Sequence, residues 1–214
     1  SARVLCAFLN ARLQGQPAVE VIDFATAVQA IIEHGVVRGV RFLDRRGQLV
    51  EARAGATLLA TGGAGQVYRE TTNPAVATGD GVALAYMAGA RVSDLEFVQF
   101  HPTVLAVPGA PRYLLSEALR GEGARLVNAS GEPFVQRYDP RGDLASRDRV
   151  SQAIVLETER TGQPVYRTLA HLPAAFVRER FPAIAELCGR VNLDLSTDML
   201  PVGPAAHYLM GGVV

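Results

Sequence analysis

Ala56-Thr57-Leu58-Leu59-Ala60-Thr61 is a continuous apolar run that ends at the glycine pair Gly62-Gly63. An unbroken run of this length is typical of a strand that is buried on both faces of a parallel sheet. Farther along, Thr78-Gly79-Asp80-Gly81 opens a helix predicted over residues 82–90, which consists almost wholly of small and apolar residues. A helix without a polar face is expected to be buried. Together the two elements predict an α/β architecture.

A β-meander is predicted upstream of this run. Three stretches rich in β-branched residues are separated by short turns, and they span residues 19–28, 36–43 and 48–53. The first residues are predicted to form a helix with its large apolar side chains on one face: Leu5, Phe8, Leu9 and Leu13. Because the chain starts inside this helix and ends on an apolar stretch, we expect it to be a piece of a longer protein.

The character of the chain changes at about Leu95. Proline, arginine and aromatic residues become commoner, and helices are predicted over residues 113–120, 147–160 and 174–188. The second helix has the clearest signal, because Ser146 stands at its N-cap. Its inward positions are expected at helical spacing: Val150, Ala153, Ile154 and Glu157. We therefore expect a domain boundary near residues 91–96.

The composition argues against several classes of protein. The chain has 214 residues, no formal net charge and 49% hydrophobic residues, which excludes disorder and argues against nucleic acid or a membrane surface as partner. No apolar run reaches the roughly 18 residues of a membrane span, and no signal-peptide pattern is present. Cys6 and Cys188 supply neither a disulfide framework nor a metal site, so a cytoplasmic location is expected. All 21 basic residues are arginine, which excludes Schiff-base chemistry on lysine.

The glycine pairs do not form a dinucleotide-binding fingerprint. In both candidate stretches the third glycine of G-x-G-x-x-G is replaced: Gly63-Ala64-Gly65-Gln66-Val67-Tyr68 and Gly121-Glu122-Gly123-Ala124-Arg125-Leu126. Thr61-Gly62-Gly63 still follows a predicted strand, where α/β sheets place their ligands, although an ordinary strand-to-loop turn explains it equally well. Asp80 is explained either as a helix N-cap or as a contact to a cofactor hydroxyl.

Four polar clusters interrupt the apolar second half: His101-Pro102-Thr103, Ser116-Glu117 with Arg120, Ser146-Arg147-Asp148, and His207-Tyr208. Glu117 and Arg120 are three residues apart on a predicted helix, a spacing that allows them to pair. Arg147 is expected at a helix N-terminus, where the helix dipole disfavours a cation. Histidines, a hydroxyl and arginines in one cleft would suit a dicarboxylate, but ordinary loop and helix-end residues give the same spacing. No spacing matches a zinc or calcium site.

These clusters resemble the succinate dehydrogenase/fumarate reductase flavoprotein family, over nearly the whole chain. The matching stretches are Leu59-Ala60-Thr61-Gly62-Gly63-Ala64, Thr72-Asn73-Pro74, Thr78-Gly79-Asp80-Gly81, Gln99-Phe100-His101-Pro102-Thr103, Ser116-Glu117-Ala118-Leu119-Arg120-Gly121-Glu122-Gly123, Leu144-Ala145-Ser146-Arg147-Asp148 and Pro204-Ala205-Ala206-His207-Tyr208. Family members usually carry threonine at the position of Ser116, and serine keeps the hydroxyl group.

The resemblance implies a fold of the α/β plus α+β class. Residues 1–94 would be the later part of a Rossmann-like FAD-binding domain, with the meander, the return strand and the buried helix. Residues 95–208 would be a fumarate-reductase-type capping domain that holds the substrate. Residues 209–214 would start the return into the FAD-binding domain, whose first glycine-rich unit would lie upstream of this chain.

The resemblance also assigns roles to individual residues. FAD, bound non-covalently, would contact Ala27, Val28, Thr61, Gly62, Gly63 and Asp80. The carboxylates of a small dicarboxylate substrate would be held by His101, Ser116 and His207. The catalytic residues would be Arg147, which moves the proton, and its relay, Glu117 and Arg120. An arginine is an unusual acid or base because its pKa in water exceeds about 12, so this role rests on the resemblance alone.

The activity implied is the FAD-dependent oxidation of L-aspartate to iminoaspartate, with oxygen or fumarate as electron acceptor, in the biosynthesis of NAD. Quinolinate synthase would then consume the product. A flavoprotein subunit of fumarate reductase or succinate dehydrogenase, acting on fumarate or succinate, is an alternative within the family. A non-catalytic remnant that serves as a binding module is an alternative of another class. Because parts of the flavin site would lie outside these residues, the chain alone is expected to be inactive.

Overall fold

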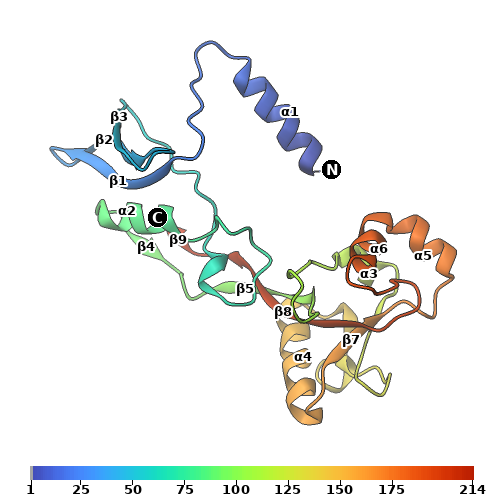
Figure 1. Cartoon of the computed structure of the whole chain (residues 1–214). Helices are drawn as coiled ribbons and strands as arrows, with labels where there is room; N and C mark the ends of the chain where they lie inside the picture. The colour runs from blue at the N-terminus through green and yellow to red at the C-terminus, as the bar shows by residue number, and fades with distance from the viewer. Residues whose placement is uncertain (1) are drawn as a thin grey trace. The chain divides into compact units, whose positions relative to one another are not determined.

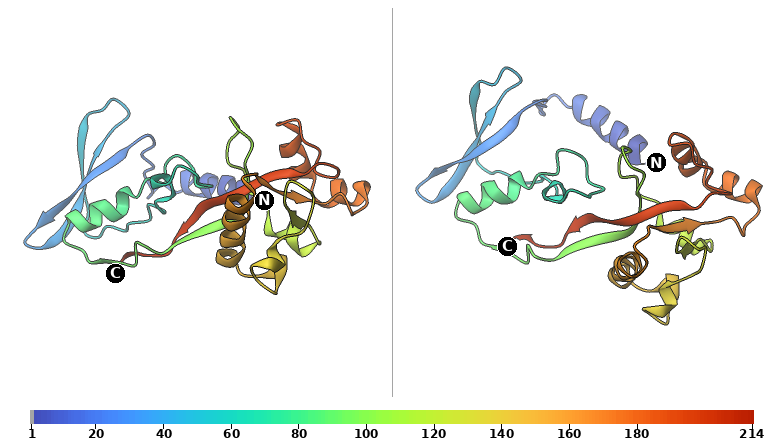
Figure 2. Two further views of the ribbon diagram at one scale, coloured as in Figure 1. Left: turned by 90° about the horizontal axis from the view of Figure 1, so that it is seen from below. Right: turned by 60° about the horizontal axis from the view of Figure 1, so that its bottom comes forward.

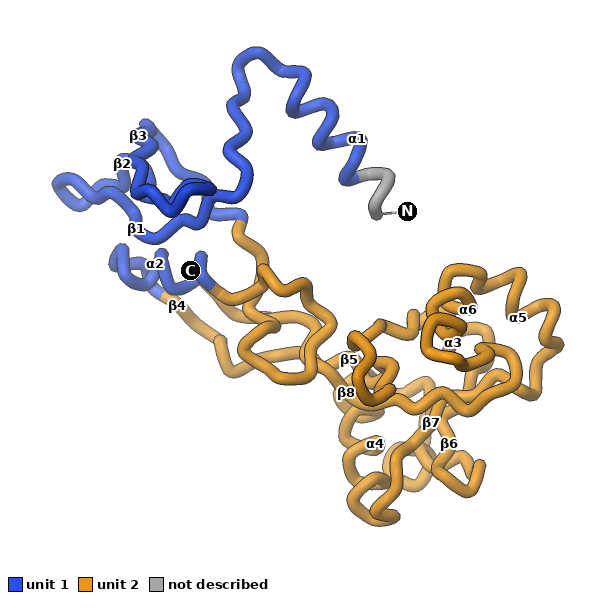
Figure 3. Tube along the Cα trace, viewed as in Figure 1, with its two compact units in different colours: residues 1–60, 80–91 blue, residues 61–79, 92–214 orange. Residues whose placement is uncertain are grey.

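We describe the protein from a computed structural model that covers residues 2–214, with side chains from Cys6 onward. The chain separates into two compact units (Figure 3). Unit 1 contains residues 1–60 and 80–91, and unit 2 contains residues 61–79 and 92–214. Helices and sheets occur in both units, so the fold is of the mixed class.

Unit 1 is built around a three-stranded antiparallel sheet with the order β1-β2-β3 (Figure 1). Its elements are α1 (Ala2–Gln14), β1 (Thr26–Glu33), β2 (Val36–Leu43), β3 (Leu49–Arg53) and α2 (Asp80–Met87). His34 and Gly35 close the first hairpin with φ angles of 52° and 77°, the left-handed geometry of a two-residue turn that matches strand twist. This turn fixes the register, because Glu33 pairs with Val36 and each later pair follows from it.

The first strand of the meander lies later in the chain than the predicted residues 19–28. A strand forms only where a partner is present, and β2 ends at Leu43, which pairs with Thr26. The residues before Thr26 therefore have no strand opposite them, although they are rich in β-branched residues. The two other predicted strands, residues 36–43 and 48–53, are confirmed to within one residue as β2 and β3.

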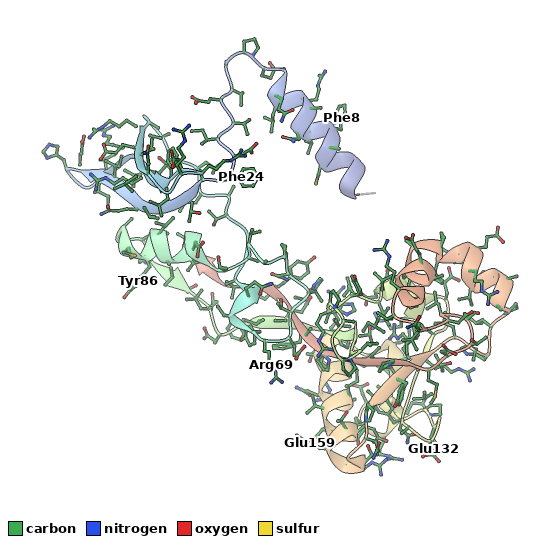
Figure 4. All side chains as sticks on the ribbon, viewed as in Figure 1. Phe8, Phe24, Arg69, Tyr86, Glu132 and Glu159 are labelled. Carbon is green, nitrogen blue, oxygen red and sulfur yellow. The ribbon has the colours of Figure 1, made fainter. Side chains whose placement is uncertain are left out.

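The strand predicted over residues 56–61 is not formed. Apolar character favours a buried strand, but strand pairing needs a neighbour, and no described residue forms a ladder with this segment. Leu58 is 89% exposed as a result. The prediction that the following helix is buried is also only partly correct. Leu84 and Ala85 of α2 are buried, whereas Tyr86 points away from the helix and is 67% exposed (Figure 4).

Unit 2 contains a four-stranded antiparallel sheet with the order β5-β8-β7-β6 and a two-stranded pair, β4-β9. Its strands are β4 (Val92–Ser93), β5 (Val98–Leu105), β6 (Arg125–Val127), β7 (Val165–Thr168), β8 (Leu200–Leu209) and β9 (Gly212–Val213). Its α-helices are α3 (Glu117–Gly121), α4 (Arg147–Thr161), α5 (Ala174–Arg180) and α6 (Pro182–Gly189). Three short 3-10 turns complete it: Gly65–Val67, Val135–Arg137 and Gly142–Leu144.

The core of unit 2 lies between its sheet and its helices. Strand β8 runs along β5, and α4 contacts both of them (Figure 2). The largest apolar side chains of this core are fully buried: Leu105, Leu115, Leu119, Phe134, Ile154 and Leu200. The inward positions predicted for α4 are confirmed, because its apolar stripe and Glu157 are buried. The helix begins directly after Ser146, as predicted, but the Ser146 hydroxyl makes no capping hydrogen bond.

Two predicted helices of unit 2 differ from the observed ones. Residues 113–115 pair with β5 instead of starting a helix, so α3 begins only after Ser116, whose hydroxyl oxygen accepts a hydrogen bond from the Ala118 N–H. The helix predicted over residues 174–188 is divided into α5 and α6. Pro182 causes this division, because proline has no N–H and disfavours the helical conformation of the residue before it.

Within residues 2–214, no helix is long and apolar enough to cross a membrane. No group of three or more histidine, cysteine, aspartate or glutamate side chains is placed there to hold a metal ion. Both cysteines are free thiols, and burial raises the pKa of Cys188 to about 11.

Glu157 is a buried carboxylate at the centre of a polar network in the core of unit 2. It is fully buried and accepts hydrogen bonds from Arg160 Nη2 at 2.6 Å and from the Tyr138 hydroxyl at 2.8 Å. Asn128 Nδ2 adds a third donor at 3.2 Å. These bonds, with that from Arg160 first, lower the pKa of Glu157 to about 2. The ionised form therefore stabilises the fold at neutral pH, and this contribution is lost as the pH falls toward 2.

Glu157→Gln is expected to lower the free energy of unfolding by about 2 kcal/mol at pH 7, because a neutral amide cannot replace the charge-assisted hydrogen bonds. Chemical denaturation of the variant measures this difference. Glu159→Gln is the matched control, because Glu159 lies on the exposed face of the same helix (Figure 4). Equal unfolding free energies for the two variants would contradict the structural role of Glu157.

Candidate functional site

Glu117 and Arg120 form an ion pair at the two ends of the short helix α3. Arg120 Nη2 donates to Glu117 Oε1, so the pairing expected from their spacing is formed. Arg120 is itself anchored, because its Nη1 donates to the Ala145 carbonyl at 3.0 Å. The guanidinium is thereby held by backbone on one side and presents its charge to the carboxylate on the other.

Arg147 extends this ion pair to a second helix. It is the first residue of α4, and its Nη2 and Nε donate to Glu117 Oε2 at 2.5 and 3.2 Å. Its Nη1 donates to Gln99 Oε1 on β5 at 2.7 Å. The hydrogen bond from Arg147 lowers the pKa of Glu117, so this carboxyl group is ionised at neutral pH. The carboxylate offsets the cost of a cation at a helix N-terminus.

His101 is a buried, neutral histidine beside this cluster. Its side chain on β5 is only 2% exposed, and its Nδ1 accepts a hydrogen bond from the Thr103 N–H at 3.2 Å. Because Nδ1 acts as the acceptor, the ring proton is assigned to Nε2. Burial lowers the pKa of His101 to about 4, and the positive charge of Arg147 adds to the effect. The ring therefore offers one neutral Nε2–H donor at pH 7.

His207 lies against His101 and shares its character. The two rings meet edge to face, with centroids 5.5 Å apart and planes at 71°. Thr72 Oγ1 lies 2.8 Å from His207 Nδ1. The Thr72 hydroxyl also lies 3.4 Å from the Ala206 carbonyl, which accepts hydrogen bonds from the Thr72 N–H at 3.0 Å and the Thr71 hydroxyl at 2.9 Å. We assign the Thr72 hydroxyl proton to the shorter contact with Nδ1, which puts the ring proton on Nε2, while burial lowers the pKa of His207.

Arg147 lines two separate hollows. The inner pocket encloses only about 10 Å³, room for about one water molecule, and it is lined by His101, Pro102, Thr103, Glu117, Arg120, Arg147, Val150 and Arg167. The outer groove is open and much larger, about 1420 Å³, and runs between β5, α4 and the turn at Tyr68. Ser116 and His207 line neither hollow, although Ser116 is adjacent to Glu117 and His207 lies against His101. Both histidines, three arginines and one carboxylate are thus brought together within unit 2.

The residues expected to contact FAD are divided between the two units. Ala27, Val28 and Asp80 belong to unit 1. Val28 lies at an irregularity in the ladder between β1 and β2, a feature that redirects side chains. Asp80 is the first residue of α2 and not the residue before it, so it is not an N-cap. Thr61-Gly62-Gly63 belongs to unit 2.

The glycine pair offers an open approach to backbone. Gly62 has a φ of +75°, and no atom lies within 4 Å of the position that a Cβ would take there. Within the part of the chain that the structure describes, the N–H groups of residues 55–63 donate no backbone hydrogen bonds. Free amides on an open glycine backbone fit the polar edge or phosphate of a bound cofactor.

Sequence reasoning missed three residues of the site. Gln99 and Thr72 occur in the motifs without an assigned role, and in the structure they are hydrogen-bonded to Arg147 and His207. Arg167 lies in none of the motifs. A weak signal exists for it, because Val165, Arg167 and Leu169 alternate along β7 and the segment after it, and all three are buried. An arginine at the inward position of such a pattern is unusual.

Comparisons with known proteins point to one family. The FAD binding domain family matches residues 2–214. The L-aspartate oxidase of Nostoc sp. is 46% identical over 220 residues, which cover 100% of this chain and 38% of that protein. The L-aspartate oxidase of Halobacterium salinarum is 44% identical over 216 residues, covering 98% of this chain and 41% of that protein. The chain therefore spans about two fifths of the length of these relatives.

Solved structures agree with this result. A quinol–fumarate reductase with menaquinol molecules matches with a TM-score of 0.86 and 38% identity, over 98% of this chain and 39% of that chain. The Mycobacterium smegmatis Sdh1 in complex with UQ1 matches with a TM-score of 0.75 and 32% identity, over 98% of this chain and 36% of that chain. The chain belongs to the FAD binding domain family, the flavoproteins of the succinate dehydrogenase/fumarate reductase type.

Proposed function

We propose that this chain is part of an FAD-dependent enzyme that oxidises L-aspartate to iminoaspartate, with oxygen or fumarate as electron acceptor. The observation that carries the proposal is the ionic chain Arg120–Glu117–Arg147 beside the neutral rings of His101 and His207. Fixed cations and neutral N–H donors suit a dicarboxylate. The names of the curated relatives support L-aspartate as the substrate.

The proposed domain arrangement follows the same family likeness. Residues 1–94 would belong to a Rossmann-like FAD-binding domain, residues 95–208 would form the capping domain, and residues 209–214 would lead back to the first. The open glycine backbone at Gly62, with its free amides, fits FAD as the bound group. We assign Ala27, Val28, Thr61, Gly63 and Asp80 to the same contact.

The mechanism divides binding and proton transfer among residues that line the inner pocket and residues beside it. When bound, FAD supplies the acceptor for the two electrons of the oxidation. His101 and His207 hold a substrate carboxylate through their Nε2–H groups, and we assign the Ser116 hydroxyl to the same group. Arg147 moves the proton at the substrate carbon. Glu117 orients Arg147 through two hydrogen bonds, and Arg120 prevents the carboxylate from turning away.

A fumarate reductase or succinate dehydrogenase activity is the second candidate, because solved structures of those names match this chain closely. The same pocket residues would serve either substrate. For the first candidate we also propose that quinolinate synthase consumes the iminoaspartate and that the protein acts in the cytoplasm. The first addition follows from the proposed product and the second from the cysteine usage of the sequence, and both are independent of the pocket geometry.

Two experiments separate these functions. One measures L-aspartate-dependent peroxide formation, and the other is a titration of the purified chain with FAD. Saturable flavin binding and peroxide from L-aspartate, formed by this chain or by the complete reading frame that contains it, would agree with the proposal. Succinate oxidation with an artificial acceptor, without any reaction of L-aspartate, would replace it by the second candidate. A complete protein that binds no FAD would leave only a non-catalytic binding module.

Arg147→Lys is expected to lower kcat at least about 100-fold in the complete enzyme, because a lysine cannot hold both Glu117 and Gln99 while it faces the substrate. Arg149→Lys is the matched control, since Arg149 is exposed two residues along the same helix and is expected to keep nearly full activity. Steady-state kinetics with L-aspartate measure both variants. An Arg147→Lys enzyme with normal kcat would remove Arg147 from the proton transfer.

The proposed role of His101 requires a neutral ring, and this has a consequence for stability. The folded chain binds a proton at His101 only near pH 4, whereas the unfolded chain binds it near pH 6.5. Because the unfolded state takes up the proton first, stability falls as the pH drops below about 6.5. The loss that this one group contributes is about 2 kcal/mol between pH 7 and pH 5.

His101→Gln should therefore lose about 2 kcal/mol less stability than the unmodified chain between pH 7 and pH 5. Urea denaturation at the two pH values measures the difference, and His171→Gln, at an exposed histidine, provides the control. The same pH dependence in all three proteins would show that His101 titrates normally, which would contradict its role as a buried neutral donor.

A further inference from the structure

Arg167 is a buried cation to which the structure gives no partner. It lies on β7, between β6 and β8, and is 2% exposed. Within the described part of the chain, its Nε and Nη1 are buried without any hydrogen-bond partner. A guanidinium in this state has lost its hydration without replacement, which destabilises the fold unless an anion or water compensates. The compensation of this buried charge therefore has to be identified.

The nearby carboxylates of Glu117 and Asp143 do not compensate the charge of Arg167. Both oxygens of Glu117 are already occupied by Arg120 and Arg147. Asp143 accepts a hydrogen bond from the Leu126 N–H at 3.0 Å, and no ion pair joins it to Arg167 among the described residues. Burial lowers the pKa of Arg167 to about 10, so the side chain still carries its charge at neutral pH.

The position of Arg167 is fixed by the sheet and directed to the inner pocket. Its backbone pairs with Leu126 on one side and with Leu200 on the other, so the strand cannot shift to expose it. The side chain lines the same pocket as His101, Arg120 and Arg147. The lining of this pocket thus contains three guanidinium groups and one carboxylate, that of Glu117, which leaves an excess of positive charge at the pocket.

We propose that Arg167 is an additional anion-binding residue of this pocket, and that one of its free donors, Nε or Nη1, takes a carboxylate group of the substrate, directly or through the one water molecule for which there is room. The inference relies on the proposed function only for the identity of the anion as a C4 dicarboxylate. It also explains why a buried cation without a partner is kept: the bound carboxylate offsets its desolvation.

Calorimetric titration with succinate at low ionic strength, on the unmodified chain and on Arg167→Leu, tests this inference. Neutral succinamide is the uncharged control ligand. The apparent Kd for succinate should rise at least about tenfold in Arg167→Leu, since a charge-assisted hydrogen bond is lost. Arg125→Leu, at an exposed arginine on the neighbouring strand β6, should bind succinate normally. Succinamide should bind to none of these proteins.

Thermal unfolding without any anion provides the second readout. Arg167→Leu should melt at the same temperature as the unmodified chain or higher, because it removes an uncompensated buried charge. A lower melting temperature together with an unchanged Kd for succinate would show that Arg167 only supports the fold, and would overturn the inference while leaving the proposed function intact.

If the unmodified chain binds no succinate, the proposed substrate class is tested on the complete reading frame, and Arg167 is judged on this chain with sulfate as the probe. Stabilisation of the unmodified chain and of Arg125→Leu by sulfate, absent in Arg167→Leu, would still assign an anion site to Arg167. Equal stabilisation of all three proteins by sulfate, or no stabilisation of any of them, would overturn the inference about Arg167.

Discussion

Glu117 is the ionic centre on which the arrangement of the site depends. One of its oxygens holds Arg120, which is anchored to the Ala145 carbonyl, and the other holds Arg147, which also reaches Gln99. A single carboxylate thereby joins α3, α4 and β5. Without it, three cations would face one another in a partly buried space, and Arg147 would stand at a helix N-terminus with nothing to offset its charge.

The remaining features of the pocket follow from this excess of positive charge. Burial and the neighbouring cations keep His101 and His207 neutral, and the contacts at their Nδ1 atoms leave the protons on Nε2. Neutral donors and fixed cations together favour an anionic ligand. The arrangement reduces the stability of the fold, because Arg167 is buried without a partner. Binding sites that are preorganised for a ligand commonly lower the stability of the fold that carries them.

The sequence predicts what depends on neighbouring residues and misses what depends on distant ones. Strand β2 and helix α4 match their predictions within one residue, because alternation, caps and helical spacing are local signals. Residues 56–61 have the composition of a buried strand, yet no described strand pairs with them. The Glu117–Arg120 pair follows from a spacing of three, whereas Arg147 meets Glu117 across 30 residues. Only the family resemblance places Arg147 beside Glu117. Neither local spacing nor the resemblance indicates Arg167.

The central claim is that the arginine cluster held by Glu117, together with two neutral histidines, is a binding site for a dicarboxylate. A crystal structure of the protein with succinate at pH 7 tests it most directly. The account predicts one carboxylate within hydrogen-bond distance of the Nε2 atoms of His101 and His207, with the contact between Arg147 and Glu117 retained. Succinate bound away from the inner pocket, with both histidine Nε2 atoms facing water or protein, would contradict it.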